Sequence, residues 1–120
     1  MSGAGLSVFV FGIYLVLTGA GFTFVPNTML GLFGLARTTE HWIRVMGWLV
    51  LLVGYYYIQA GRHDLRQFLP WTVVARVSVF LAFAAFVLLG WAPAQLLIFG
   101  VVDLVGAVWT YLALRARPKG

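Results

Sequence analysis

The sequence contains no cysteine and very little charge of either sign. Without cysteine, the chain can form no disulfide, no thiolate nucleophile and no Cys-ligated metal site. Of its 120 residues, 3 are acidic and 8 are Lys or Arg, so charged residues make up 9% of the chain against 62% hydrophobic ones. Soluble domains carry about 25% charged residues. This composition therefore excludes a soluble fold and predicts an integral membrane protein.

The acidic and histidine residues are also too sparse for recognisable site chemistry. His41 and His63 fall at opposite ends of one expected helix, about 30 Å apart at the helical rise, and so cannot share a metal ion. No nucleophile and base are paired in the sequence, which makes enzymatic activity the least supported class. We expect no metal and no cofactor. The formal charge of +5 comes from basic residues beside apolar runs, where they indicate membrane topology and not nucleic-acid binding.

Long apolar runs account for most of the chain. At roughly 20 residues per span, a chain of this length crosses a bilayer about four times. The sequence therefore predicts an all-α, polytopic membrane protein, with one four-helix transmembrane bundle over residues 1–120. The expected spans are 6–25, 42–61, 71–90 and 93–114. No Lys or Arg precedes the first run, which is longer than a signal-peptide core, so we expect a retained helix.

The segment from Pro26 to Thr39 separates the first two expected spans. It is too short and too glycine-rich to cross the membrane, and too apolar for a solvated loop. It predicts a short interfacial or re-entrant helix. The alternative is a hydrophobic loop lying on the membrane surface.

Glycine recurs every seven residues in the first two spans, at Gly5, Gly12 and Gly19 and again at Gly47 and Gly54. Seven residues is nearly two helical turns, so each set forms a stripe along one helix face. Small residues in such a stripe let a neighbouring backbone approach closely. The stripes predict close helix packing, either within the chain or against a partner helix.

Basic residues are distributed unequally between the two ends of the expected helices. Arg62, Arg66 and the tail from Arg115 to Lys119 fall at the end that also holds the N-terminus, against Arg37 in the opposite connection. The positive-inside rule then places both termini in the cytoplasm of an inner (cytoplasmic) membrane. The same bias argues against dual topology.

Asp103 is the deepest charge expected in the membrane. It lies about ten residues, or roughly 15 Å, from each end of its span, where insertion scales assign a carboxylate a cost of roughly 2.5 to 3.5 kcal/mol. Arg76 and Arg44 are each offset from it by roughly 9 to 10 Å along the helix axes, which long side chains can partly close. An ion pair would keep Asp103 ionised and lock the bundle or recognise an anion. An unpaired, protonated acid would instead couple to a proton or hydrogen-bond a ligand.

Three further residues complete the expected polar network. Glu40 and Arg44 are spaced for an ion pair at the start of the second span, with His41 on nearly the same face. Tyr55 lies at about the depth of Arg76 and is a candidate hydroxyl donor. The predicted site is therefore Asp103, Arg76, Arg44, Glu40, His41 and Tyr55. The alternative for the Glu40 group is a purely structural ion pair at a helix terminus.

The segment from Trp42 to Gly47, the run from Gly54 to Tyr57, and Arg76 in the third span of a short four-span chain resemble the DoxX-like small bacterial membrane proteins. The resemblance implies an accessory four-helix protein, in some cases associated with oxidoreductases or quinone-linked systems. In outline that family is also similar to four-helix sterol-binding and isomerase proteins, whose intramembrane acids line a ligand cavity. Here Asp103 and Glu40 lie on different helices at different depths, which argues against isomerase chemistry.

These observations predict a small membrane protein whose Asp and Arg site binds an amphiphilic small molecule, such as a quinone, a sterol-like lipid or a hydrophobic substrate, or an accessory membrane subunit. The expected partners are membrane lipids, a second copy of the chain or another membrane protein. Trp48, Tyr55 and Phe83 are candidate apolar walls of the site. The alternative is an oligomeric transporter or channel in which Asp103 takes up and releases a proton. A purely structural subunit, whose glycine stripes bind a partner helix, is the third possibility.

Overall fold

The computed structural model describes residues 2–37 and 41–116, and within these ranges the chain is helical and contains no strand. The helices are α1 (Gly3–Phe24), α2 (Pro26–Leu32), α3 (Trp42–Arg62), α4 (Leu69–Leu88) and α5 (Leu96–Ala116). Four of them, α1, α3, α4 and α5, are long and apolar enough to cross a membrane. The predicted all-α membrane fold with four spanning helices is confirmed, and a short helix, α2, lies in the segment between the first two.

The ends of the spanning helices differ from the predicted bounds by a few residues, for local reasons. Helix α1 begins at Gly3 because the side chain of Ser2 accepts a hydrogen bond from the backbone N–H of Gly5 at 3.0 Å, which caps the helix. Helix α4 begins at Leu69, with a proline in its first turn, where the missing N–H costs nothing. Helix α5 begins at Leu96 and not at Pro93, whose carbonyl accepts from the Leu96 N–H in the preceding turn.

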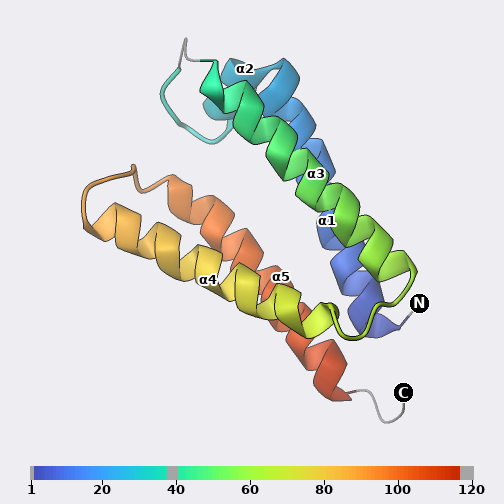
Figure 1. The fold of residues 1–120 in the computed structure, drawn as a ribbon. Coiled ribbons are helices and arrows are strands. Elements are labelled where there is room, and N and C mark those ends of the chain that lie inside the picture. The colour runs from blue at the N-terminus through green and yellow to red at the C-terminus, as the bar shows by residue number, and fades with distance from the viewer. Residues whose placement is uncertain (1, 38–40, 117–120) are drawn as a thin grey trace.

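The spanning helices are arranged as two pairs (Figure 1). Helices α1 and α3 pack together along their length, and α4 and α5 form a second antiparallel pair. The pairs meet mainly through α1 and α5, near the start of α1 and the end of α5, and diverge toward the end that carries α2. The bundle is therefore closed at one end and splayed at the other.

Glycines hold α1 and α3 in direct backbone contact. The facing pairs are Gly5 with Gly61, Gly12 with Gly54, and Gly19 with Gly47. A Cβ added at Gly54 would lie 2.8 Å from the carbonyl oxygen of Gly12, and one added at Gly12 would lie 2.8 Å from the carbonyl oxygen of Gly54. Such close approach supplies the van der Waals contact that drives helix association in lipid. The two glycine stripes therefore face each other within the chain, which leaves neither of them for a partner helix.

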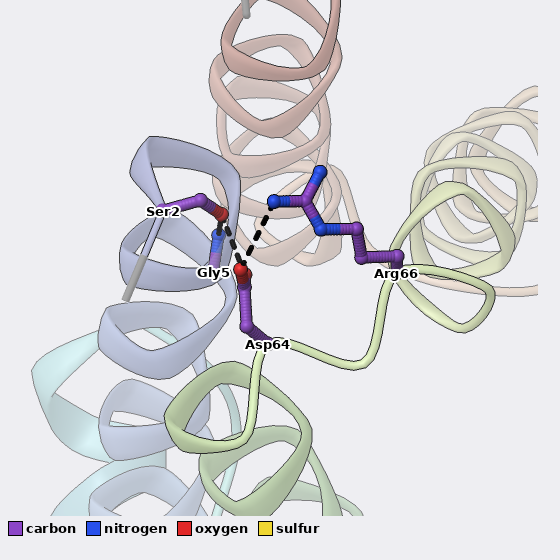
Figure 2. A network of polar contacts seen from close by, with 4 residues as sticks. All are labelled: Ser2, Gly5, Asp64 and Arg66. Atoms are coloured by element: carbon purple, nitrogen blue, oxygen red, sulfur yellow. Dashed lines mark hydrogen bonds and ion pairs between the residues drawn. The ribbon is translucent and has the colours of Figure 1, made fainter. Parts of the chain in front are cut away.

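The connection between α3 and α4 is fastened to the start of α1 (Figure 2). The Ser2 hydroxyl donates to one carboxylate oxygen of Asp64, and Nη2 of Arg66 lies 3.5 Å from the other. Asp64 has a φ of 52°, a left-handed conformation that Asp tolerates because its short polar side chain can bond locally. This contact places the α3–α4 connection at the closed end of the bundle, where α1 begins.

Candidate functional site

An apolar cavity of about 470 Å³ lies where the two helix pairs diverge. Every helix contributes to its wall, including Tyr14 and Phe22 of α1, Leu30 of α2, Met46 of α3, Phe83 of α4 and Phe99 of α5. Among the described residues that line it, only Asp103 is charged. The cavity is thus an apolar chamber with one charged group among its described lining residues, and of the three predicted wall residues it includes Phe83 but not Trp48 or Tyr55.

Asp103 is half-buried on α5 and faces this cavity. Among the residues that the structure describes, no Lys or Arg nitrogen lies within 4.0 Å of its carboxylate. Of the two alternatives for Asp103, the direct ion pair with Arg76 or Arg44 is therefore not present among the described residues. The carboxylate is left facing the apolar chamber.

Arg76 lies in the closed end of the bundle, where its side chain is only 1% exposed, and it is not one of the residues that line the cavity. Its Nε donates to the carbonyl oxygen of Thr72 at 3.1 Å, and its Nη2 donates to the hydroxyls of Thr72 and Thr110 at 3.0 and 2.8 Å. The guanidinium carbon lies 4.9 Å from the ring centre of Phe11 and 5.8 Å from that of Tyr57, within cation–π range. Arg76 therefore contacts side chains from all four spanning helices.

Thr110 extends this network to α1. Its hydroxyl oxygen lies 2.6 Å from that of Ser7, and the Ser7 hydroxyl donates to the carbonyl oxygen of Ala4 at 2.7 Å. Because a hydroxyl has one proton, Thr110 must donate to Ser7 while it accepts from Arg76. Ser7, Thr72 and Thr110 are all buried. None of the three was predicted as a site residue, although Thr72 lies one helical turn before Arg76 and Thr110 two turns after Asp103, which is the signal that could have identified them.

One nitrogen of Arg76 stands apart from this network. Within residues 2–37 and 41–116, Nη1 is buried and has no hydrogen-bond partner. It lies beside Gly106, where an added Cβ would be 3.1 Å from it. Gly106 is one turn from Asp103 on α5, on the Asp103 side of Thr110. Nη1 is thus the guanidinium nitrogen nearest to the Asp103 end of the network.

Arg44 does not approach Asp103. Its Nη1 donates to the carbonyl oxygens of Thr23 and Phe24 at 2.7 and 3.5 Å, at the end of α1, where helix carbonyls lack intrahelical partners. A cation at this position also complements the helix dipole. The structure therefore places Arg44 in a helix-capping position, away from the predicted network.

His41 and Tyr55, the other predicted site residues that the structure describes, do not lie with Asp103 either. His41 is exposed at the start of α3, and Glu40 lies outside the described residues. Tyr55 is 50% exposed and packs against Tyr56, whereas Tyr57 is buried beside Arg76. Tyr55 is rotated by about 100° from Gly54 on the helix, so the glycine contact with α1 turns it outward. In the described part of the chain, no group of three or more His, Cys, Asp or Glu side chains could hold a metal ion.

The capping position of Arg44 gives a first prediction. Arg44→Ala should lower the free energy of unfolding by less than about 1 kcal/mol, the usual range for a cation at a helix C-terminus. It should leave occupancy of the cavity unchanged, because the guanidinium is bonded to the end of α1 and does not line the chamber. Thermal unfolding in detergent and native mass spectrometry of bound lipids would measure the two effects. A large fall in the amount of bound lipid at unchanged stability would show instead that Arg44 takes part in binding.

Comparison with protein-family models, with curated proteins and with solved structures finds no match for this chain. The resemblance to DoxX-like proteins therefore stays a prediction.

Proposed function

We propose that this protein binds an amphiphilic small molecule in the cavity between its two helix pairs, with the polar group of the molecule beside Asp103. The observation that supports this most directly is the chamber itself, about 470 Å³ in volume, with apolar walls and one charged residue. Small-molecule sites are typically apolar clefts of about 300 to 1,000 Å³ with a few polar groups that orient the ligand. A quinone, a sterol-like lipid or a similar hydrophobic substrate has the matching combination of a large apolar body and a small polar end.

The isolation of Asp103 supports a binding role over a purely structural one. A structural acid inside a membrane is expected to be paired with a cation or a hydrogen-bond donor, because leaving it unpaired is costly. Among the described residues, Asp103 has no ion pair, and the nearby Arg76 is bonded to the threonines of α4 and α5. A ligand that donates to the carboxylate would offset its cost in the membrane.

The closed end of the bundle favours binding over proton-coupled transport. In a proton-coupled transporter, the group that takes up and releases the proton must be accessible from both sides of the membrane. Here the region beyond Asp103 on α5 is filled by Gly106, Phe11, Arg76 and Thr110, with Ser7 behind them. Transport through Asp103 would require this network to open, whereas binding requires only the splayed end.

We also propose the inner membrane as the location, with both termini in the cytoplasm. Arg62, Arg66 and Arg115 flank the closed end, and the positive-inside rule assigns such an end to the cytoplasmic side. The cavity then opens toward the outer half of the bilayer, beside α2. Lipids or an amphiphile in that leaflet would reach it directly.

Asp103→Leu tests the proposed function. A leucine preserves the apolar character of α5 but removes the one charged group that the described residues contribute to the cavity lining. We expect the amphiphile that co-purifies with the wild-type protein to bind about tenfold more weakly, which corresponds to the loss of one hydrogen bond to a charged group. Native mass spectrometry of the protein released from its own membrane would measure occupancy.

Val105→Leu is the matched control, since Val105 is 63% exposed on the same helix, away from the cavity. It should retain wild-type occupancy. A wild-type protein that carries no amphiphile, or an Asp103→Leu protein that carries the same species at the same occupancy, would refute the proposal.

A further inference from the structure

We infer that Tyr14 of α1 is a second ligand-binding residue of the cavity, and that its hydroxyl donates a hydrogen bond to a neutral oxygen atom at the polar end of the amphiphile. This inference rests on the proposed function, because it names the chemistry of the molecule that occupies the same cavity. It depends on the position of Tyr14 relative to Asp103, on the few polar side chains that line the cavity, and on the protons that these side chains carry.

The packing of α1 against α5 places Tyr14 opposite Asp103. Three contacts fix the register of these two antiparallel helices (Figure 1): Ser7 with Thr110, Phe11 with Gly106, and Phe22 with Phe99. Moving seven residues toward the splayed end from both Ser7 and Thr110 reaches Tyr14 and Asp103. Seven residues is nearly two turns, so both residues stay on the facing sides of their helices at the same depth. The electrostatic effect of Asp103 on the Tyr14 hydroxyl agrees with this placement.

Few polar side chains line the cavity. Besides Asp103, the described lining residues with a nitrogen or oxygen atom in the side chain are Tyr14, Thr18 and Trp42. Trp42 lies at the start of α3, at the splayed end, whereas Thr18 lies one turn after Tyr14 on α1. The inner part of the cavity therefore presents a phenol, an alcohol and a carboxyl group, and the rest of its wall is mainly apolar.

The Tyr14 hydroxyl has a proton to donate whatever the protonation state of Asp103. A tyrosine hydroxyl keeps its proton at neutral pH. Thr18 contributes a side-chain hydrogen bond to Tyr14, but one bond between two hydroxyls uses only one of their two protons. The ring of Tyr14 packs against that of Phe11, with ring centres 5.4 Å apart, which holds the phenol in place. The site therefore offers a positioned donor to an acceptor on the ligand.

The surroundings of Tyr14 select an acceptor that carries no charge. The described residues that line the cavity include no Lys or Arg, so an anionic headgroup would be buried without a counter-ion, which is strongly unfavourable. A protonated amine has no lone pair and cannot accept a hydrogen bond from Tyr14. A carbonyl or hydroxyl oxygen accepts the bond and stays neutral. The ligand class is thus an amphiphile with such an oxygen at its polar end.

The test uses a probe that accepts hydrogen bonds but cannot donate them. Dodecan-2-one and 2-methyldodec-1-ene have nearly the same shape, because a CH₂ group replaces the carbonyl oxygen. Each would be equilibrated with the full chain in lipid nanodiscs, and gas chromatography would measure the probe retained above that in empty nanodiscs. Dodecan-2-amine, which is protonated at neutral pH, should be retained less than the ketone.

Tyr14→Phe removes the hydroxyl but keeps the ring that packs against Phe11. We expect this variant to bind the ketone about fivefold more weakly than the wild type, as the loss of one neutral hydrogen bond implies. Binding of the alkene should not change. Tyr55→Phe is the matched control, since Tyr55 is exposed and lies outside the cavity lining; it should bind both probes as the wild type does.

Infrared spectroscopy distinguishes a direct bond from a structural role of Tyr14. A hydrogen bond to a carbonyl oxygen lowers its stretching frequency. Dodecan-2-one labelled with carbon-13 at the carbonyl should therefore show a lower frequency in the wild-type protein than in empty nanodiscs, and Tyr14→Phe should reverse this shift. A bound ketone without the shift in the wild type would overturn the inference, even if Tyr14→Phe did not fold.

The outcomes separate the inference from the proposed function. A carbonyl frequency that is the same in the wild type and in Tyr14→Phe would overturn the inference and leave the proposed function standing, because the ketone still binds. Tighter binding of dodecan-2-amine than of the ketone would also overturn it, in favour of a cationic ligand. A wild-type protein that retains none of the probes above empty nanodiscs would refute the proposed function together with the inference.

Discussion

Gly54→Leu is expected to separate α1 from α3 and to abolish the folded protein in detergent. A Cβ at Gly54 would lie 2.7 Å from the backbone nitrogen of Val16 and 2.8 Å from the carbonyl oxygen of Gly12. These are backbone atoms and cannot rotate aside as a side chain does. Overpacking a core against side chains costs about 1 to 3 kcal/mol, so a leucine forced against backbone should exceed that range. The result would be measured as loss of a monodisperse species in gel filtration and of a cooperative thermal transition.

Gly31→Leu provides the control for this experiment. Gly31 lies on α2, and a Cβ there would meet nothing within 4 Å. Its φ is not positive, so leucine can adopt its backbone conformation. This variant should unfold at the wild-type temperature. If Gly54→Leu did the same, the close contact between α1 and α3 would not be what stabilises the pair.

The spans could be predicted from the sequence because they depend on composition and length alone. A run of about 20 apolar residues has few alternatives to a membrane helix. The orientation of each helix was harder to infer, because lipid-facing and buried faces are both apolar and the pattern of polarity is weak. In α3 the register is set by Gly47, Gly54 and Gly61 against α1. This register buries Tyr57 and exposes Tyr55, the tyrosine that was predicted for the polar network.

The polar network was only partly predictable, for a similar reason. The depth of Asp103 follows from counting along its helix, and the structure places it on the cavity wall. The partners of the arginines depend on tertiary packing, which the sequence does not specify. Arg44 reaches the free carbonyls at the end of α1, and Arg76 reaches two threonine hydroxyls. Acids were considered as the partners of the arginines, but neutral hydroxyl and carbonyl oxygens in a membrane bundle accept hydrogen bonds as well.

Thr110→Val is expected to lower the free energy of unfolding by about 2 kcal/mol, the usual cost of losing a hydrogen bond to a buried charged group. Valine keeps the shape of threonine but cannot accept from Nη2 of Arg76, which lies 2.8 Å from the hydroxyl, or donate to Ser7. Ordinary interhelical hydrogen bonds in membranes average only about 0.6 kcal/mol. The larger value is expected here because the donor is a buried cation whose Nη1 already lacks a partner among the described residues. Thr28→Val, on the exposed side of α2, should cost almost nothing.

A double-mutant cycle would show whether Thr110 acts through Arg76. In an Arg76→Met background the Nη2 bond is already absent, so Thr110→Val should cost less than about 0.5 kcal/mol, a loss confined to the contact with Ser7. Additive losses in the cycle would instead mean that Thr110 stabilises the bundle independently of the guanidinium. Because Arg76 lies on α4 and Thr110 on α5, the coupling energy also measures how strongly these two helices are held together at the closed end of the bundle. A strong coupling would imply that the bond from Nη2 of Arg76 to Thr110 joins α4 to α5, while the contact of Thr110 with Ser7 joins this pair to α1.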